Sequence, residues 1–361
     1  MATASTNSGS IDQPTTHIAT DQKENLMKLR ILLPLFLCLS LLLMACPAPA
    51  AAPGGAVEGT AAKPEIVRLD YAYYNPSSLV LRKFGWLEEE LAKDNIKVEW
   101  VLSAGSNKAN EFLRSEAIDF GSTAGAAALL AAANGSPIEA VYIFSKPEWA
   151  ALVVGKDSPI QSVAELKGKK IAATKGTDPY FFLLRSLHEN GLSAADVEIV
   201  NLQHADGRTA LERGEVDAWA GLDPFMAQTE LEQGSRLLYR NIDFNSYGFL
   251  NARTEFISAY PQQTEIVLTQ YERARQWILD NKDEAAQILA DEAKLSLEVA
   301  KQELFERTVL TESPIPGEAQ HTALTAIIPI FTAENQVKEG TDVAAVLDKL
   351  FNTKFIEAVT K

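Results

Sequence analysis

The sequence predicts an α/β fold made of two α/β lobes joined by a two-stranded hinge, with a helical C-terminal part on the first lobe. Three observations lead to this prediction. Short apolar, β-branched segments alternate with amphipathic segments from about residue 65 onward. One short motif occurs twice in matching surroundings, and helical patterns dominate after Tyr247. Alternation of strands and helices with short loops is typical of sheets covered by helices on both faces.

The individual elements follow from hydrophobic periodicity and from turn residues. The predicted strands are 66–71, 97–102, 118–121, 138–144, 150–154, 169–174, 197–201, 218–220, 237–240 and 248–252. The predicted helices are 79–93, 107–115, 124–134, 179–190, 206–213, 224–232, 263–281, 282–292, 296–310, 318–335 and 343–350.

An internal repeat favours two lobes of similar topology. Residues 113–120 read L-R-S-E-A-I-D-F, and residues 211–218 read L-E-R-G-E-V-D-A. In both, a helix end leads into an Ile/Val-Asp pair, a short strand and a new helix N-terminus. We expect lobe 1 to comprise residues 65–155 and 244–361, and lobe 2 residues 156–243. Crossings near 154–156 and 244–248 would form a hinge that permits closure around a ligand.

The first 46 residues have the pattern of an export signal. Residues 31–45 are almost wholly apolar and fall short of the roughly 20 that span a bilayer. Lys28 and Arg30 precede this segment, as in a secretory signal, and Met27 is the expected true start in place of Met1. Residues 43–46, Leu-Met-Ala-Cys, resemble a lipoprotein processing box. That resemblance implies cleavage before Cys46 and a lipid on its thiol, whereas the alternative is a plain signal with an incidental cysteine.

Composition limits the class of partner. The net charge is −15, and residues 1–46 contribute nothing to it because their basic and acidic residues cancel. Nucleic-acid binding needs basic patches and is not expected. The two cysteines are Cys38 and Cys46, so stability has to come from an apolar core and not from disulfides. Residues 47–64, rich in Ala, Pro and Gly, are expected to form a flexible tether.

Several stretches together resemble one protein family. They are V-R-L-D-Y at 67–71, S-L-V-L at 78–81, G-W-L at 85–87, A-I-D-F-G-S-T at 117–123, D-S-P-I-Q-S-V-A-E-L-K-G-K-K-I-A at 157–172, K-G-T at 175–177 and G-E-V-D-A-W-A-G-L-D-P-F at 214–225. These stretches resemble the sulfonate/nitrate/taurine solute-binding proteins of ABC importers. The last and strongest of them is similar to aliphatic sulfonate-binding proteins in particular. The resemblance covers residues 66–260 well and the helical tail loosely.

The resemblance implies a type II periplasmic-binding-protein fold, with a ligand bound between two lobes that close and dock on a membrane permease. It implies a monomer that delivers a small organosulfonate anion to an ABC permease and its ATPase. It also implies an exported protein, anchored by its N-terminal lipid to the outer face of the cell membrane or in the periplasm. No cofactor and no metal are expected. The chain itself has no G-x-x-x-x-G-K-[ST] loop.

The ligand of such a fold binds beyond the carboxyl ends of the strands, where helices begin. Helix N-termini offer free N–H groups and a positive dipole end, which suit an anion. Loops rich in Ser, Thr, Asn and Gly follow predicted strands at 73–78, 104–107, 121–125, 175–178 and 221–224. The candidate ligand-binding residues are Tyr74, Asn75, Ser77, Ser106, Ser122, Thr123, Glu148, Trp149, Lys175, Gly176, Thr177 and Asp223.

The polar candidates are expected to bind the charged groups of the ligand. The hydroxyls of Ser122 and Thr123 are expected to donate to the anion, although helix capping is the alternative for every Ser and Thr here. Lys175 is the preferred cation, with a solvated lysine as the alternative. An acid in an anion site is costly unless it meets a cation. A Glu148 that faces the cleft would therefore indicate a ligand with an ammonium group.

The apolar candidates are expected to wall a pocket for an alkyl or aryl tail. They are Tyr74, Trp149 and Phe181, and core packing is the alternative for each. Leu222 stands before Asp223, where sulfonate binders of the resembled family often have an aromatic residue. This departure indicates a wider or differently shaped pocket.

Other ligands and roles remain open. Taurine, nitrate or a pyrimidine-type solute would suit the same role, and a sensor lipoprotein that presents its ligand to a receptor would share these features. An enzyme is not favoured. His188, His204 and His321 are isolated in the sequence, and no catalytic motif or metal-ligand spacing appears.

Overall fold

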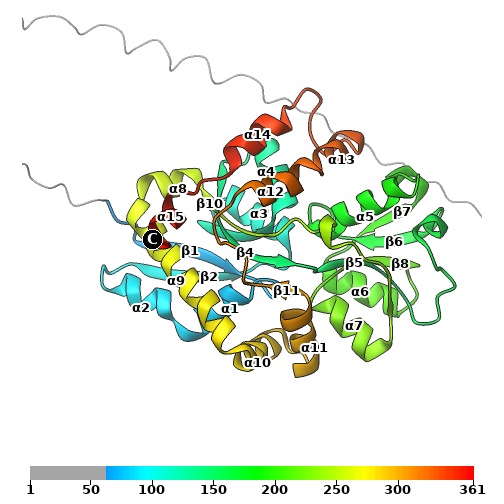
Figure 1. The fold of residues 1–361 in the computed structure, drawn as a ribbon, viewed down its shortest axis with the longest axis horizontal. Coiled ribbons are helices and arrows are strands. Elements are labelled where there is room, and N and C mark those ends of the chain that lie inside the picture. Colours follow the sequence, from blue (N-terminus) through cyan, green and yellow to red (C-terminus); the bar gives the residue numbers. More distant parts are fainter. Residues whose placement is uncertain (1–61) are drawn as a thin grey trace, which may run out of the picture. The chain divides into compact units, whose positions relative to one another are not determined.

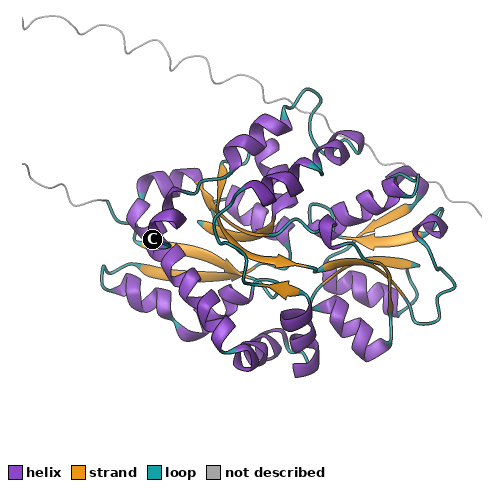
Figure 2. Ribbon diagram, viewed as in Figure 1, coloured by secondary structure: helices purple, strands orange, loops and turns teal. Residues whose placement is uncertain are grey.

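The computed structural model describes residues 62–361. The predicted signal region, the lipidation site at Cys46 and most of the tether lie outside the described residues. Within them the chain forms a six-stranded sheet, with strand order β11-β4-β10-β3-β1-β2, and a five-stranded sheet, with order β7-β6-β8-β5-β9 (Figures 1 and 2). The predicted α/β class with two sheets is confirmed. We call the first sheet with its helices lobe 1, and the second sheet with its helices lobe 2.

The strands of lobe 1 form a mixed sheet. β1 pairs in parallel with β2 and β3, and β10 runs antiparallel between β3 and β4. The bounds are β1 (Ile66–Tyr71), β2 (Lys97–Leu102), β3 (Phe120–Ala124), β4 (Ile138–Pro147), β10 (Gly248–Arg253) and β11 (Thr308–Val309).

Two groups of helices cover the lobe 1 sheet, and Figure 1 shows them on opposite sides. One group is α1 (Pro76–Phe84), α2 (Trp86–Ala92), α9 (Pro261–Asp280) and α10 (Lys282–Ala293). The other is α3 (Ser106–Arg114), α4 (Gly125–Ala133), α12 (Glu318–Thr325) and α14 (Val343–Leu350). The remaining α-helices of the chain after β10 are α8 (Thr254–Ala259), α11 (Leu297–Lys301), α13 (Ile328–Ala333) and α15 (Lys354–Val359).

Lobe 2 has the same layered construction. Helix α5 (Asp178–Glu189) lies on one face of the sheet, and α6 (His204–Glu212) and α7 (Phe225–Gln233) lie on the other (Figure 1). Its strands are β5 (Ala150–Val154), β6 (Lys170–Ala173), β7 (Glu198–Asn201), β8 (Ala218–Leu222) and β9 (Arg236–Tyr239). Burial of a large apolar side chain contributes roughly 1.5–3 kcal/mol. Fully buried residues such as Phe181 and Trp219 therefore hold these layers together.

Three long predicted helices are interrupted, each for a local reason. The segment 79–93 divides at Gly85, whose φ of 67° is left-handed and ends α1. The segment 318–335 divides before Pro329, which occupies the first turn of α13. The segment 296–310 forms α11 and a π-helical turn (Gln302–Glu306), and then ends in the short strand β11 beside β4.

One predicted boundary differs from the structure. Strand β5, which the sequence analysis assigned to lobe 1, pairs with β8 and β9 in the second sheet. The first crossing therefore lies at residues 148–149 and not near 154–156. A buried, β-branched strand packs equally well in either sheet, so the sequence pattern does not reveal its partner. Within the described chain, no helix combines the length and apolar character that crossing a membrane requires.

Candidate functional site

A small pocket of ≈ 80 Å³ lies between the two lobes. It is formed by loops that follow β1, β2, β7 and β8, so it occupies the position expected for a ligand at the carboxyl ends of strands. Its lining residues are Tyr73, Tyr74, Leu102, Ser103 and Ala104 from lobe 1, and Gln203, His204, Ala205, Leu222, Asp223, Pro224 and Phe225 from lobe 2.

Three larger hollows do not have this position. The smallest of them, of ≈ 170 Å³, is lined by residues of α9, the π-helical turn and β11, and by none from the loops that follow the parallel strands. The remaining two are larger. One, of ≈ 610 Å³, is lined by residues of lobe 2 where β6 and β8 begin. The other, of ≈ 390 Å³, is lined by residues of lobe 1 where β1 begins. Both lie at the amino ends of the parallel strands and involve one lobe each. The interlobe pocket is therefore the candidate site.

Two helix N-termini meet at this pocket from opposite lobes. Helix α3 begins after Gly105, and α6 begins after Gln203. A Cβ placed on Gly105 would lie only 2.9 Å from Nε2 of His204, the first residue of α6. No side chain in the described part of the chain caps either helix. The free N–H groups and positive dipole ends of both helices are thus available to one anion.

Helix α7 also begins near the pocket, but the Asp223 carboxylate already occupies its N-terminus, so this N-terminus is not available to an anion. Its Oδ1 accepts a hydrogen bond of 2.8 Å from the backbone N–H of Ala227 in the first turn of α7. The carboxylate also meets Arg307, whose Nη1 lies 3.1 Å from Oδ1 and 3.3 Å from Oδ2. Burial raises the pKa of Asp223 to about 6, against the opposing effect of Arg307. The predicted residue Asp223 thus lines the pocket with its charge already paired.

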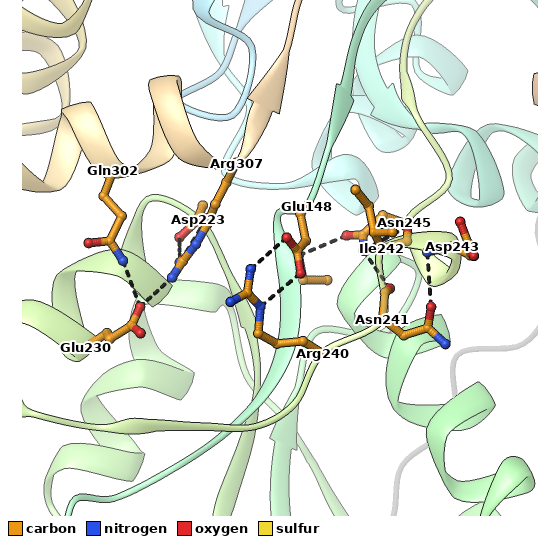
Figure 3. Close-up of polar contacts among 11 residues, drawn as sticks. Glu148, Asp223, Glu230, Arg240, Asn241, Ile242, Asp243, Asn245, Gln302 and Arg307 are labelled. Atoms are coloured by element: carbon orange, nitrogen blue, oxygen red, sulfur yellow. Dashed lines mark hydrogen bonds and ion pairs between the residues drawn. The ribbon is translucent and has the colours of Figure 1, made fainter.

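Arg307 belongs to lobe 1, so its contacts join the lobes (Figure 3). Besides Asp223 it binds Glu230 of α7, and Glu230 also accepts a hydrogen bond of 2.8 Å from Gln302. The Arg307 side chain is 5 % exposed and the Asp223 side chain 0 %. Breaking a pair buried to this degree leaves an uncompensated charge, so the pair strongly favours the observed arrangement of the lobes.

The segments that cross between the lobes are fixed by two further contacts. Glu148 forms a bidentate ion pair with Arg240, in which Nε donates to Oε1 at 2.9 Å and Nη2 donates to Oε2 at 2.7 Å (Figure 3). Trp149 donates from Nε1 to Asp178 at 2.8 Å, and Ser246 donates to the same carboxylate from its backbone N–H and its hydroxyl. The cation that Glu148 requires is supplied by the protein itself, so a ligand ammonium group is not needed for that purpose.

A buried polar network surrounds Ser122 in lobe 1. Ser122 donates to Asp70 from both its backbone N–H and its hydroxyl, and it accepts from Nδ2 of Asn75 at 2.8 Å. The hydroxyl of Tyr74 donates to the Ser122 carbonyl at 2.9 Å. Burial raises the pKa of Asp70 to about 6, although the hydrogen bonds from Ser122 and Ser103 oppose this rise. Ser122 and Asn75 are thus already hydrogen-bonded within the protein.

The other predicted polar residues also have partners or lie elsewhere. Thr123 accepts from Asn251 at 2.7 Å, Ser106 accepts from the N–H of Ala124 at 2.9 Å, and Thr177 donates to a carbonyl in its own turn. Lys175 is exposed and does not line the pocket.

Two further predicted residues do not line the pocket. Ser77 is buried, and its hydroxyl has no partner in the described chain. Gly176 approaches α3, since a Cβ on it would lie 3.7 Å from the Cβ of Asn107. Of the twelve predicted residues, Tyr74 and Asp223 are therefore the two that line the pocket.

Sequence reasoning missed the lobe 2 loop at residues 202–205. This loop follows the predicted strand 197–201 and so fulfils the rule for carboxyl ends, but it lacks the Ser, Thr and Gly used to select candidates. It supplies Gln203 and His204, and lobe 1 adds the unpredicted Ser103. Within residues 62–361 no cluster of His, Cys, Asp and Glu has the arrangement of a metal site. The helix N-termini of α3 and α6 beside the pocket suit the binding of a small anion.

The fold and this interlobe pocket define a two-lobed binding protein, and comparisons with known proteins agree. Residues 85–285 match the family described as NMT1/THI5 like, and the chain belongs to that family. The chain is 30 % identical over 257 residues to a candidate aliphatic sulfonates-binding protein of Escherichia coli (strain K12), covering 71 % of this chain and 80 % of that protein. A Bacillus subtilis (strain 168) protein of the same description is 28 % identical over 282 residues, covering 77 % and 84 %.

Solved structures give the same result for the fold. The alkanesulfonate-binding protein SsuA of Xanthomonas axonopodis pv. citri, bound to MOPS, has a TM-score of 0.72 and 27 % identity, covering 79 % of this chain and 99 % of that one. The periplasmic aliphatic sulphonate binding protein SsuA of Escherichia coli has a TM-score of 0.69 and 26 % identity, covering 81 % and 94 %. The desulfurization enzyme DSZB has a TM-score of 0.62 at 14 % identity, a likeness of fold alone. The expected periplasmic-binding-protein fold is confirmed.

Proposed function

We propose that this chain is the extracytoplasmic solute-binding protein of an ABC importer and that its ligand is a compact aliphatic sulfonate. The observation that carries the proposal is the convergence of two uncapped helix N-termini, α3 and α6, on a pocket between two lobes. Three relatives are named for aliphatic sulfonates or alkanesulfonate as their ligand, whereas a nitrate-binding protein of 15 % identity shares the fold alone. The role of permease and ATPase as partners, and the monomeric state, belong to the same proposal.

The pocket itself favours a small ligand. Its volume of ≈ 80 Å³ is well below the roughly 300–1,000 Å³ typical of sites for drug-sized molecules. Leu222 and Phe225 offer an apolar wall near the N–H groups that face the anion. A short alkyl chain on a sulfonate matches this combination. Opening of the lobes at residues 148–149 and 240–247 would admit the ligand.

Isothermal titration calorimetry of the full chain tests this function. Alkanesulfonates of increasing chain length, taurine, nitrate and a thiamine-type pyrimidine are the probes. We expect short alkanesulfonates to bind, with affinity falling once the chain exceeds the pocket. Heat from nitrate or the pyrimidine, with none from any sulfonate, would retain an importer role and reject the sulfonate.

We also propose that Cys46 carries a lipid that anchors the exported protein at a membrane. The support is the order of charges, apolar segment and cysteine in residues 28–46. Cys46→Ser should move the protein from the membrane fraction to the soluble fraction of cells. Cys38→Ser is the matched control, because Cys38 lies within the segment that is expected to be removed. Equal membrane retention of both variants would reject the anchor.

A further inference from the structure

Thr174 determines which nitrogen of His204 carries the proton. Oγ1 of Thr174 lies 2.7 Å from the carbonyl oxygen of Leu202 and 3.2 Å from Nδ1 of His204. Because a carbonyl only accepts, the hydroxyl proton of Thr174 points to Leu202, and its oxygen accepts from Nδ1–H. A neutral imidazole protonated on Nδ1 carries a lone pair on Nε2. Nε2 of His204 is therefore a hydrogen-bond acceptor.

This acceptor is buried in the pocket and unsatisfied. His204 is 1 % exposed and lines the interlobe pocket, and its Nε2 has no hydrogen-bond partner within residues 62–361. Burial keeps the ring neutral by lowering its pKa to about 3. A buried acceptor without a partner is costly, and such groups are rare unless they have a role.

Further unsatisfied groups lie around the same space. Oδ1 of Asn107, from lobe 1, is also buried without a partner in the described chain. This atom and Nε2 of His204 each lie 2.9 Å from the position that a Cβ on Gly105 would take. Gly105 thus marks the point where the two lobes approach too closely for a side chain, and one unsatisfied group from each lobe lies beside it. Gln203 adds another buried side-chain oxygen that has no partner within the described residues, and it also lines the pocket.

A sulfonate group alone cannot satisfy this set. It is fully ionised in neutral water, so it offers oxygen acceptors and no proton to donate. Its oxygens can accept hydrogen bonds from the free N–H groups of α3 and α6. The lone pair of Nε2 repels these oxygens, because both are hydrogen-bond acceptors. A second group on the ligand has to provide the donor.

We propose that the ligand of this pocket is a substituted sulfonate whose second polar group, a hydroxyl or an ammonium, donates a hydrogen bond to Nε2 of His204. The inference rests on the sulfonate-binding function proposed above and narrows it to a class of ligand. His204 becomes the residue that separates substituted from plain alkanesulfonates. A site built to bond a donor discriminates strongly against an analogue that lacks it, because its buried group is then left unpaired.

Three probes of nearly equal size test this selectivity. They are propane-1-sulfonate, 2-hydroxyethanesulfonate and 2-aminoethanesulfonate, which differ at one end by a methyl, a hydroxyl or an ammonium group. Titration of the full chain should show at least about tenfold tighter binding of one donor-bearing probe than of propane-1-sulfonate. The tighter of the two donor probes identifies the donor as hydroxyl or ammonium.

Two variants connect the preference to His204. His204→Phe keeps the ring shape and removes the acceptor, so it should bind all three probes with similar affinity. His204→Gln retains an oxygen that reaches the same region and should recover part of the preference. Circular dichroism and thermal unfolding of both variants verify that they fold.

The outcomes separate the inference from the function on which it rests. Binding of propane-1-sulfonate as tightly as the donor-bearing probes, or an unchanged preference in His204→Phe, would overturn the role of His204 and leave sulfonate binding intact. Proton uptake on binding, seen as heats that depend on the buffer, would also overturn it, since Nε2 would then donate to the anion. No heat from any of the three sulfonates would reject the proposed function itself.

Discussion

Arg307 and Asp223 form a buried ion pair across the two lobes, with Nη1 of Arg307 at 3.1 and 3.3 Å from the two carboxylate oxygens. Asp223 lines the interlobe pocket, and Arg307 stands between the π-helical turn and β11 of lobe 1 (Figure 3). The pair therefore connects the ligand pocket to the C-terminal helical part of the protein. Its burial makes its contribution to stability measurable.

Replacing Arg307 should destabilise the protein substantially. Arg307→Met removes the cation that pairs with Asp223, so the carboxylate stays buried with its charge unpaired, at a cost of about 3–5 kcal/mol. Urea unfolding at pH 7 measures this loss. The double variant Arg307→Met with Asp223→Asn should regain part of it, because position 223 then carries no unpaired charge.

A surface arginine provides the control for this experiment. Arg213 lies 3.9 Å from Glu215, and their side chains are 69 % and 60 % exposed. Arg213→Met should change the free energy of unfolding by less than about 0.5 kcal/mol. Equal effects of the two arginine substitutions would contradict the role assigned to the buried pair.

The elements that the sequence predicts well are those fixed by local pattern. Strands β1 and β2 have the predicted bounds. Short segments rich in β-branched and aromatic residues and bordered by polar residues favour a strand over a helix. The pattern fails where the partner of an element decides the outcome. Strand β5 is as apolar as its neighbours, yet it belongs to the second sheet. The short strand β11 is fixed by pairing with β4, which lies far away in sequence.

The candidate site was predictable in its location and less so in its residues. The rule that ligands bind at carboxyl ends leads to the loops that hold Tyr74 and Asp223. Hydroxyl-rich composition was a poor guide within those loops, since Ser122 and Thr123 serve the hydrogen bonding of the protein itself. His204 carries no sequence signal beyond its position after a strand. Its role depends on Thr174 and on the opposite lobe, which only the folded chain brings together.

Gly105 allows the location of the site to be tested without changing a polar group. Gly105→Ala forces a methyl group into the close contact between the lobes, 2.9 Å from both Nε2 of His204 and Oδ1 of Asn107, so these groups have to move. Its φ of 163° is extended backbone that alanine also adopts, so the effect should come from occupied space. We expect ligand affinity to fall by at least about tenfold, roughly 1.4 kcal/mol, in calorimetric titration.

Gly155→Ala is the matched control for this test. A Cβ on Gly155 meets no atom within 4 Å, so the substitution adds the same methyl group in open space. Its affinity for the ligand should equal that of the wild type. If Gly105→Ala also binds with unchanged affinity, the ligand occupies a different part of the protein.

Trp149 offers a test of the hinge contact. Trp149→Phe keeps an aromatic ring against Tyr74, which it meets edge-on at 5.7 Å, and removes the Nε1 donor to Asp178. Loss of a hydrogen bond to a buried carboxylate should cost about 1–3 kcal/mol of unfolding free energy. Trp100→Phe is the comparison, because its donor bonds Glu88 at a partly buried site and should cost less. An equal or larger loss in Trp100→Phe would argue against a special role for the Trp149 contact.

Asp70 should make the protein less stable as the pH rises from about 4 to 6. Burial raises its pKa in the folded protein from the ordinary 3.8 to about 6. Between these values the folded chain holds a proton that the unfolded chain has released, so the free energy of unfolding falls with rising pH. The full destabilisation by Asp70, roughly 3 kcal/mol for about two pH units, is present above pH 6 and absent below the unfolded pKa.

Asp70→Asn should lack this dependence, so its stability relative to wild type should increase by that amount between pH 4 and pH 7. Urea unfolding of both proteins across this range measures the difference, which isolates Asp70 because the other buried carboxyl groups are common to both. Parallel stability curves for the two proteins would show that Asp70 has the same pKa in the folded and unfolded states.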